Sequence, residues 1–287
     1  MEDFEGKVAV ITGGASGIGY GMARAFLKAG MKVAILDANA RHLDEVRAEL
    51  AGSNGVHFIQ VDVTDRAAMA RAADEVERVF GKVHVVCNNA GVASGQSADE
   101  ADYAEWDRVL GVNLGGVING VKSFVPKIKA HGEGGHVVNT SSMAGLIPLP
   151  DTGGIYAASK FAVRGLTDSL RLNLAKDGVG VSTLCPGLTR SRIMATANPD
   201  AGAVEQDALF NDMSGAMDPE ELGAAVLEGI RRNDPYILPH GEFKDEVRGI
   251  FDEILALFPE GQDVPEARLA FEARRREITE AAKRGEA

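Results

Sequence analysis

The stretch Lys7-Val-Ala-Val-Ile-Thr-Gly-Gly-Ala-Ser-Gly-Ile-Gly19 joins a short apolar run, a glycine-rich turn and the beginning of a helical pattern. Lys7–Ile11 has the composition of a buried strand, and helical spacing of apolar residues continues from Gly17 to Ala29. Glycines let a backbone approach a pyrophosphate, and a helix N-terminus offers free N–H groups and a positive dipole end. A glycine-rich turn is a weak signal alone, but this one has the strand-turn-helix context that a dinucleotide site requires.

The same alternation of strand and helix continues along most of the chain. Strands alternating with helices form a parallel sheet that is covered on both faces, and ligands bind along the edge where the strands end. We predict strands at Lys7–Ile11, Lys32–Asp37, His57–Val61, Val83–Cys87, His136–Thr140, Val179–Leu184 and Tyr236–Leu238, and helices at Gly17–Ala29, Ala40–Leu50, Arg66–Phe80, Tyr103–Lys129, Ile155–Ala175, Pro219–Arg232, Phe243–Phe258 and Pro265–Ala282.

The pattern changes after Pro186. Residues 190–217 show no clear period, and we interpret them as a substrate lid. The pattern contains no linker long enough to demand a second domain. We therefore predict a single domain over residues 1–287, with a cofactor-binding and catalytic core at 1–189 and a helical C-terminal extension at 240–287.

Composition narrows the classes of partner. The chain has 30 Lys and Arg against 42 Asp and Glu, a net charge of −12, which argues against nucleic acid or an acidic membrane surface. No apolar run is long enough to span a bilayer, and the short acidic segment 1–6 is unlike a signal peptide, so we expect the cytoplasm. Cys87 and Cys185 each follow an apolar run and are predicted to be buried free thiols, and we expect no metal site.

An acidic residue ends the second predicted strand and bears on the choice of cofactor. Asp37 lies 18 residues after Gly19, where a carboxylate accepts hydrogen bonds from both ribose hydroxyls of NAD and repels the additional phosphate of NADP. The glycine turn contains no Arg or Lys, and neither follows Asp37 directly. Arg41 is the one reservation, although its position one turn into the next helix favours a solvated side chain. We therefore predict NAD.

Polar residues also follow the third and fourth predicted strands. Asp62 and Val63 are placed to meet the adenine, although Asp62 has an equal claim to cap the next helix, a role for which Thr64 and Asp65 compete. Asn88-Asn89-Ala90-Gly91 could form a tight turn, could let the backbone pass close to the ribose, or could do both.

A second motif, Tyr156 and Lys160, lies in a predicted helix, so that the two side chains share one face. A nearby positive charge lowers the pKa of a tyrosine from its ordinary value of about 10, and such a tyrosine can take a proton from an alcohol or give one to a ketone. Ser142 could hold the same oxygen, and Asn113 could kink its helix or hold a water near Lys160. Tyr-x-x-x-Lys is a common chance pair, but its combination with a dinucleotide-type turn favours chemistry.

In order and approximate spacing, these motifs resemble those of the classical short-chain dehydrogenases and reductases. The resemblance covers about Lys7 to Pro239 and implies an extended Rossmann fold, an α/β architecture with a doubly wound seven-stranded parallel sheet. It rests on Thr12-Gly13-x-x-x-Gly17-x-Gly19, Asn88-Asn89-Ala90-Gly91, Asn113, Ser142, Tyr156-x-x-x-Lys160 and Pro186-Gly187.

The resemblance also implies roles. Tyr156 is the expected acid/base, Ser142 orients the substrate oxygen, Lys160 holds the nicotinamide ribose and lowers the pKa of the tyrosine, and Asn113 anchors a water in a proton relay. The residues expected around NAD are Gly13, Ser16, Gly17, Ile18, Gly19, Asp37, Asp62, Val63, Asn89, Ala90, Gly91, Tyr156, Lys160, Pro186, Gly187, Thr189 and Ser191, of which the last four meet the nicotinamide amide.

Two departures from the family pattern are visible. Ser142 precedes Tyr156 by 14 residues, one more than is usual, which leaves Ser141 as a less favoured alternative. Ser191 stands where the family often has Thr, so a hydroxyl is retained. Residues 111–121, the run Tyr236-Ile-Leu-Pro and the two C-terminal helices resemble bacterial Cα-dehydrogenases that oxidise benzylic alcohols of lignin-derived aryl ethers.

The predicted function is reversible NAD-dependent oxidation of a secondary alcohol to a ketone. An NAD-sensing binding protein without turnover is the alternative. An apolar substrate, aromatic, steroid-like or terpenoid, is favoured by Val92, Leu146, Ile147, Leu149 and the lid; for the lid residues Met194, Leu209, Phe210, Met213 and Met217, core packing is an equal interpretation. The family resemblance implies a homo-oligomer, a dimer or tetramer, formed through the helices at 103–129 and 155–175.

Overall fold

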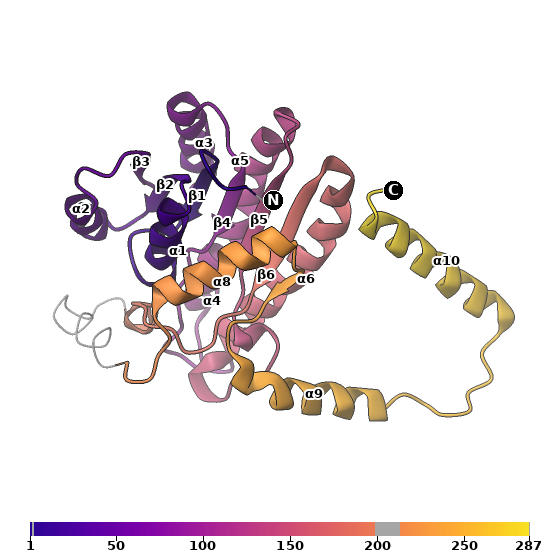
Figure 1. The fold of residues 1–287 in the computed structure, drawn as a ribbon. Helices are drawn as coiled ribbons and strands as arrows, with labels where there is room; N and C mark the ends of the chain where they lie inside the picture. Colours follow the sequence, from indigo (N-terminus) through magenta and orange to yellow (C-terminus); the bar gives the residue numbers. More distant parts are fainter. Residues whose placement is uncertain (2, 199–212, 287) are drawn as a thin grey trace.

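The computed structural model describes residues 1, 3–198 and 213–286 (Figure 1). Its centre is an all-parallel seven-stranded sheet in the order β3-β2-β1-β4-β5-β6-β7. The order reverses between β1 and β4, which opens a crevice at the carboxyl ends of these strands. The strands are β1 Val8–Thr12, β2 Lys32–Asp37, β3 Val56–Gln60, β4 Val85–Asn88, β5 Gly135–Thr140, β6 Val179–Leu184 and β7 Tyr236–Ile237. The predicted doubly wound Rossmann-type sheet is confirmed.

Alternating side chains of each strand pack into two different hydrophobic cores. Ala9 and Ile11 of β1 belong to the core on one face of the sheet, whereas Val8 and Val10 belong to the core on the other. Because both faces are covered, the central strand β1 is apolar from Val8 to Ile11. The first core contains residues of α1 (Gly17–Lys28), α2 (Ala40–Glu49) and α8 (Pro219–Arg232), and the second contains residues of α3 (Arg66–Phe80), α5 (Gly116–Ala130) and α6 (Gly154–Leu174).

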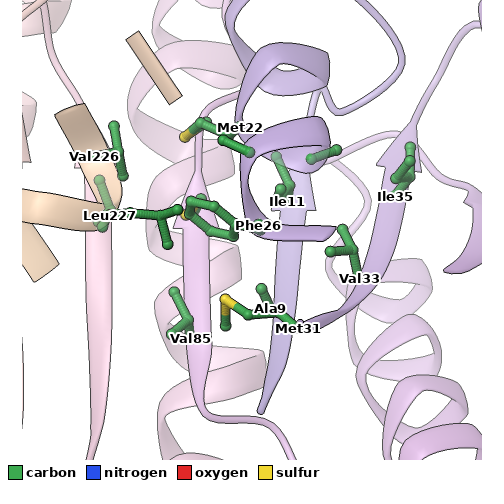
Figure 2. Packing of buried hydrophobic residues seen from close by; sticks show 14 of the residues in the cluster. Ala9, Ile11, Met22, Phe26, Met31, Val33, Ile35, Val85, Val226 and Leu227 are labelled. Carbon is green, nitrogen blue, oxygen red and sulfur yellow. The ribbon is translucent and has the colours of Figure 1, made fainter. Parts of the chain in front are cut away.

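The first core shows how the helices dock on the sheet. Met22 and Phe26 of α1 point at the strand residues, with Val226 and Leu227 of α8 beside them (Figure 2). Phe26 is fully buried, and a side chain of this size contributes about 2–3 kcal/mol when it leaves water. Asp218 caps α8 through the backbone N–H of Glu220, and Pro219 occupies the first turn, as predicted.

The predicted helical stretch at Tyr103–Lys129 is helical over its length, but a π-helical turn interrupts it at Asn113, for which a local kink was one of the two interpretations. The chain forms α4 (Tyr103–Leu110), a π-helical turn at Gly111–Gly115 and then α5. Asn113 lies in the π-helical turn, where its buried side chain bonds to other segments. Long-range bonds of this kind favour the wider turn locally, and such turns often mark functional sites.

The C-terminal helices, α9 (Lys244–Ala256) and α10 (Glu266–Lys283), contain no fully buried residue. Val247 and Ile250 of α9 pack against a small cluster that contains Cys185, while α10 lies beside α6 at the far edge of the molecule (Figure 1). Among the described residues, none of the helices is both long and apolar enough to cross a bilayer. Cys87 and Cys185 are buried free thiols, as predicted.

Candidate active site

The glycine-rich turn follows β1 and leads into α1, as predicted, and two of its glycines have left-handed backbones. A Cβ on Gly13 would lie 2.9 Å from the Cα of Ala90, and one on Gly17 would lie 2.7 Å from the Cβ of Ser191. The turn therefore passes closely between the loop after β4 and the segment after β6. Gly13, Ser16, Gly17 and Ile18 line a pocket there, beside the free N–H groups that begin α1.

Asp37 lines the same pocket from the end of β2. Its Oδ2 accepts a hydrogen bond from the backbone N–H of Ala15 at 3.1 Å, and its Oδ1 accepts one from that of Asn39 at 3.0 Å. The carboxylate thus fixes the glycine turn relative to the start of α2. Arg41, the reservation about the cofactor, forms an ion pair with Glu45 at 3.2 Å.

Asp62 and Val63 also line the pocket. Asp62 accepts hydrogen bonds from the backbone N–H and the hydroxyl of Thr64, both at 2.8 Å. Asp65 caps α3 through the N–H groups of Ala67 and Ala68. The alternative that Asp62 caps this helix was therefore wrong, and its carboxylate remains at the pocket wall.

Asn89 joins the ends of three strands. Its backbone N–H donates to the Thr12 hydroxyl at 2.9 Å, its amide nitrogen donates to the Thr12 carbonyl at 3.1 Å, and its amide oxygen accepts from the Thr140 hydroxyl at 3.3 Å. Asn89, Ala90 and Gly91 also line the pocket, so the structural and pocket-lining roles coincide. Asn88 is buried and donates to Asn139 at 2.8 Å.

Tyr156 and Lys160 lie on one face of α6 and line the pocket together. The Nζ of Lys160 is 5.4 Å from the centroid of the Tyr156 ring and donates to the Thr140 carbonyl at 3.0 Å. Only 2% of Lys160 is exposed, and the side chain passes over Gly91, where a Cβ would lie 3.3 Å from its Nζ. The i,i+4 spacing therefore brings both groups to one end of the pocket.

Desolvation shifts the pKa values of both groups. Burial raises the pKa of the Tyr156 phenol to about 12, against a smaller lowering by its hydrogen bond with Ser142. The predicted lowering of the Tyr156 pKa is not found, because desolvation raises this pKa more than the Ser142 hydrogen bond lowers it. Burial also lowers the pKa of Lys160 to about 8, so its ammonium is only modestly favoured at neutral pH.

The two candidate serines have different surroundings. The Ser141 hydroxyl is fully buried and donates to the Lys160 carbonyl at 2.8 Å. This hydrogen bond links the end of β5 to α6. The Ser142 hydroxyl is partly exposed, caps a short 3₁₀ turn at Met143–Gly145 and reaches Tyr156. The geometry thus favours Ser142, as predicted. Two short 3₁₀ turns, this one and a second at Asp151–Gly153, lie between Ser142 and Tyr156.

Asn113 uses its whole side chain to hold the loop after β4. Its oxygen accepts from the Val92 N–H at 2.8 Å, and its amide nitrogen donates to the Val92 carbonyl at 3.0 Å and to the Ser159 hydroxyl at 2.9 Å. A Cβ on Gly91 would meet both its Oδ1 and the Nζ of Lys160. The proximity to Lys160 agrees with the prediction, and the water-holding role stays a prediction.

The residues predicted after β6 divide into two groups. Pro186 and Ser191 line the pocket, whereas Thr189 is buried and pairs with Met217. A Cβ on Gly187 would collide with His240 and Phe243. Gly19, Gly187, Thr189, Asn113 and Ser142 are not among the residues that line this pocket, and their predicted contacts with cofactor or substrate stay predictions.

The sequence analysis did not predict the contacts made by residues 190–197, a segment that we call the strap. Arg190 pairs with Asp218, Arg192 pairs with Glu45 at 3.4 Å, and the Ala93 N–H donates to the Thr196 hydroxyl at 2.8 Å. These contacts attach the strap to α2, to the start of α8 and to the loop after β4. Three residues of the strap, Arg192, Ile193 and Thr196, line the pocket. The absence of a clear sequence period in this region gave no signal for these pairings.

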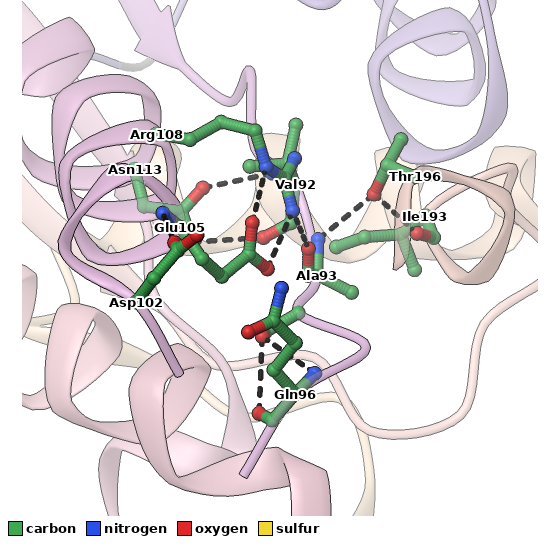
Figure 3. A network of polar contacts seen from close by, with 10 residues as sticks. Val92, Ala93, Gln96, Asp102, Glu105, Arg108, Asn113, Ile193 and Thr196 are labelled. Carbon is green, nitrogen blue, oxygen red and sulfur yellow. Dashed lines mark hydrogen bonds and ion pairs between the residues drawn. The ribbon is translucent and has the colours of Figure 1, made fainter. Parts of the chain in front are cut away.

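The loop opposite the strap is held by an ion pair within α4. Arg108 binds both carboxylate oxygens of Glu105, at 2.7 and 2.9 Å, and donates to the Ala93 carbonyl at 2.8 Å (Figure 3). The Glu105 pKa is lowered mainly by Arg108. The i,i+3 spacing of Glu105 and Arg108 could have indicated this ion pair, but such pairs are common on exposed helices and do not indicate a loop contact.

Several residues predicted to contact an apolar substrate lie elsewhere. Leu146 and Ile147 pack with Met143 and Cys185 under α9 and do not line the pocket, so their contribution to an apolar substrate site stays a prediction. Val92 does line the pocket. Of the lid residues, Met217 packs against the first core and Met194 is 55% exposed, whereas Leu209 and Phe210 lie outside the described residues. In the described part of the chain, no cluster of His, Cys, Asp or Glu could hold a metal ion.

Comparison with known proteins agrees with this geometry. The short chain dehydrogenase family matches residues 7–202. A C alpha-dehydrogenase from Sphingobium sp. strain SYK-6 is 37% identical over 95% of this chain and 93% of its own length. A structure described as a short-chain dehydrogenase from Novosphingobium aromaticivorans is 40% identical with a TM-score of 0.87, covering 100% of both chains. A short chain dehydrogenase/reductase from Burkholderia phymatum in complex with NAD is 34% identical with a TM-score of 0.79, covering 92% of this chain and 100% of its own. Both predicted resemblances are confirmed.

The burial of Lys160 leads to a prediction about stability. Its folded pKa of about 8 lies below the ordinary value of 10.5, so the unfolded chain binds a proton more tightly, and the protein loses stability as pH falls from 10.5 to 8. At neutral pH the buried ammonium group therefore lowers the free energy of unfolding by about 3 kcal/mol.

The substitution Lys160→Met removes this penalty but also removes the hydrogen bond to the Thr140 carbonyl. We therefore expect Lys160→Met to raise the free energy of unfolding by about 1–2 kcal/mol at pH 7, and we expect this gain to disappear near pH 10.5. Urea denaturation at both pH values measures it. Lys122→Met on α5 is the control, and a Lys160→Met variant that is less stable at pH 7 would contradict the prediction.

Proposed function

Because the chain belongs to the short-chain dehydrogenase family, we propose that it interconverts a secondary alcohol and a ketone by hydride transfer with NAD. The observation that supports this most directly is the position of Tyr156 and Lys160 in the same pocket as the glycine turn and Asp37. A cofactor bound along this pocket would extend from Asp37 toward Tyr156, where the substrate oxygen must lie.

We assign the proton chemistry to the chain's own residues. When bound, NAD supplies the hydride acceptor of the oxidation and, in its reduced form, the hydride donor of the reverse reaction. Tyr156 is protonated at neutral pH, so it can donate to a ketone oxygen directly. In the oxidation direction Tyr156 must first lose its proton, and the Lys160 ammonium stabilises the phenolate. Ser142 holds the reacting oxygen, and Asn113 anchors a water near Lys160.

The pocket residues fit NAD, and we propose NAD rather than NADP. The glycine turn leaves no room for a Cβ at Gly13 or Gly17, and backbone of this kind can approach a pyrophosphate. Asp37 supplies the carboxylate for the ribose hydroxyls. A relative of 34% identity has been crystallised with NAD, which supports the same choice here.

We propose an aromatic, benzylic alcohol as the substrate. Val92, Val112 and Ile193 give the pocket apolar lining, which supports an apolar substrate. We also propose that residues 190–217, of which 199–212 lie outside the described residues, serve as the lid within a single domain of residues 1–287. The relative named C alpha-dehydrogenase covers nearly the whole chain, which supports this class over steroid and terpenoid alcohols.

A substrate panel tests the reaction and its cofactor together. We expect NADH formation from aryl secondary carbinols with NAD, and much lower kcat/KM with NADP or with hydroxysteroids and terpenoid alcohols. Absorbance of the reduced cofactor measures turnover. Turnover of steroids alone would exclude the aromatic proposal. If NAD bound by calorimetry but no alcohol or ketone in the panel reacted, the NAD-sensing alternative would replace the enzyme.

Replacing the proposed acid/base gives a second test. We expect Tyr156→Phe to lower kcat/KM by about 10²–10⁴, because general acid–base catalysis of this kind contributes that much, while NADH affinity changes little. Fluorescence titration with NADH follows binding, and steady-state rates follow catalysis. Tyr103→Phe, at a side chain that is 88% exposed, is the matched control. A Tyr156→Phe variant that kept its full rate would exclude the assignment.

We also propose that the chain forms a dimer or tetramer through α4, α5 and α6. Exposed apolar side chains on two of these helices, Ile118 of α5 and Phe161 of α6, support pairing between subunits. Size-exclusion chromatography with light scattering should give twice or four times the 30.3 kDa chain mass, and Phe161→Glu should shift it toward the monomer. A wild-type protein that ran as a monomer would refute this assembly. Localisation in the cytoplasm stays a prediction.

A further inference from the structure

His240 follows β7 and bonds through both nitrogens of its ring to the segment after β6. The Gly187 N–H donates to its Nδ1 at 3.0 Å, and its Nε2 lies 3.2 Å from the Leu188 carbonyl oxygen. Because Nδ1 accepts a hydrogen bond, the neutral ring carries its hydrogen on Nε2 and donates it to Leu188. One side chain therefore fixes the backbone at two consecutive residues.

The His240 ring also packs directly against Gly187. A Cβ at this glycine would lie 2.9 Å from the Cγ and the Cδ2 of His240 and 2.6 Å from the Cε2 of Phe243. The His240 and Phe243 rings meet edge to face with their centroids 6.4 Å apart, and only 7% of His240 is exposed. The lack of a side chain at Gly187 thus lets the imidazole reach the backbone, and burial strengthens both of its hydrogen bonds.

The segment that His240 holds borders the proposed active site. Pro186 lines the pocket, and its carbonyl oxygen accepts from the Met143 N–H at 2.9 Å. The Ser142 hydroxyl lies 3.5 Å from the same oxygen and is also hydrogen-bonded to Tyr156. The segment is therefore held between the Ser142 turn and His240, at the Tyr156 end of the pocket.

We propose that His240 is a positioning residue for the nicotinamide half of the cofactor. The inference rests on the proposed NAD site, in which the cofactor extends from Asp37 toward Tyr156. His240 does not line the pocket, so it acts through the backbone that follows Pro186. By fixing this backbone it keeps the pocket wall in place where the nicotinamide must lie for hydride transfer.

The adenosine half of the pocket is built by other elements. Asp37 ends β2, and Asp62 and Val63 follow β3, whereas β6 and β7 lie at the opposite edge of the sheet. Loss of the His240 hydrogen bonds should therefore weaken the binding of the nicotinamide half and leave the binding of the adenosine half unchanged.

The test compares the affinities of NADH and of ADP-ribose, which is NADH without its dihydronicotinamide ring. His240→Leu removes both ring hydrogen bonds and leaves the Gly187 N–H without its acceptor. We expect NADH to bind about tenfold more weakly, the effect of one lost hydrogen bond, and the ADP-ribose affinity to change by less than about twofold. Calorimetry measures both affinities without turnover, and retained ADP-ribose binding shows that the variant is folded.

Two amide variants separate the two hydrogen bonds and keep the test decisive if His240→Leu fails to fold. His240→Asn places an oxygen where the ring has Nδ1 and keeps the acceptor for Gly187, whereas His240→Gln places a nitrogen where the ring has Nε2 and keeps the donor to Leu188. The Leu188 carbonyl also accepts from the Met217 N–H at 3.0 Å, so it retains a partner in either variant. We therefore expect His240→Asn to restore most of the NADH affinity and His240→Gln to restore little.

His131→Leu is the matched control. His131 has the same pattern of bonds, since its Nδ1 accepts from the Glu133 N–H at 3.1 Å and its Nε2 lies 2.8 Å from the Val83 carbonyl oxygen, but it lies at the other end of the sheet, before β4 begins. It should change neither affinity. Equal weakening of NADH and ADP-ribose in His240→Leu would make His240 a general structural residue and overturn the proposal, as would an unchanged NADH affinity.

The wild-type protein separates this inference from the proposed function. If it bound neither NADH nor ADP-ribose, the proposed NAD site would be refuted, and the role of His240 with it. If it bound NADH more tightly than ADP-ribose and His240→Leu kept that difference, the NAD site would stand and only the role of His240 would be refuted.

Discussion

The hydrogen bonds between Thr12 and the Asn89–Ala90 backbone join the ends of β1 and β4, the two strands between which the strand order reverses. The rest of the site depends on this junction. It fixes the glycine turn against the loop after β4, and Asn89 extends the connection to Thr140 at the end of β5. Thr140 in turn accepts from Lys160, so one chain of hydrogen bonds connects the cofactor turn to the proposed catalytic lysine.

The proposed catalytic groups, Tyr156 and Lys160, are buried in positions where they do not stabilise the fold. A lysine that is 2% exposed and bonded to a backbone carbonyl weakens the folded state, and a desolvated tyrosine resists ionisation. Both groups would respond strongly to a partner charge because the surrounding dielectric is low. If the proposed roles hold, these two groups lower the stability of the fold in exchange for proton chemistry, a common arrangement in enzymes.

The strap and the loop after β4 close the pocket from opposite sides, each held by side chains from another element. Thr196 connects the two segments, Arg192 connects the strap to α2, and Arg108 with Asn113 holds the loop. Polar contacts of this type are individually weak and can be exchanged for contacts with a ligand.

The sequence by itself determined the sheet, the glycine turn, the Tyr156–Lys160 pair and the position of Asp37, because strand and helix periods and i,i+4 spacing act within a few residues. Only the tertiary structure decided the π-helical turn at Asn113, the packing of Leu146 and Ile147 under α9, the contacts of the strap and the raised pKa of Tyr156. Each of these depends on burial or on a hydrogen bond between distant segments. Local sequence patterns carry no record of which distant group will be the partner, or of how much water will remain around a side chain.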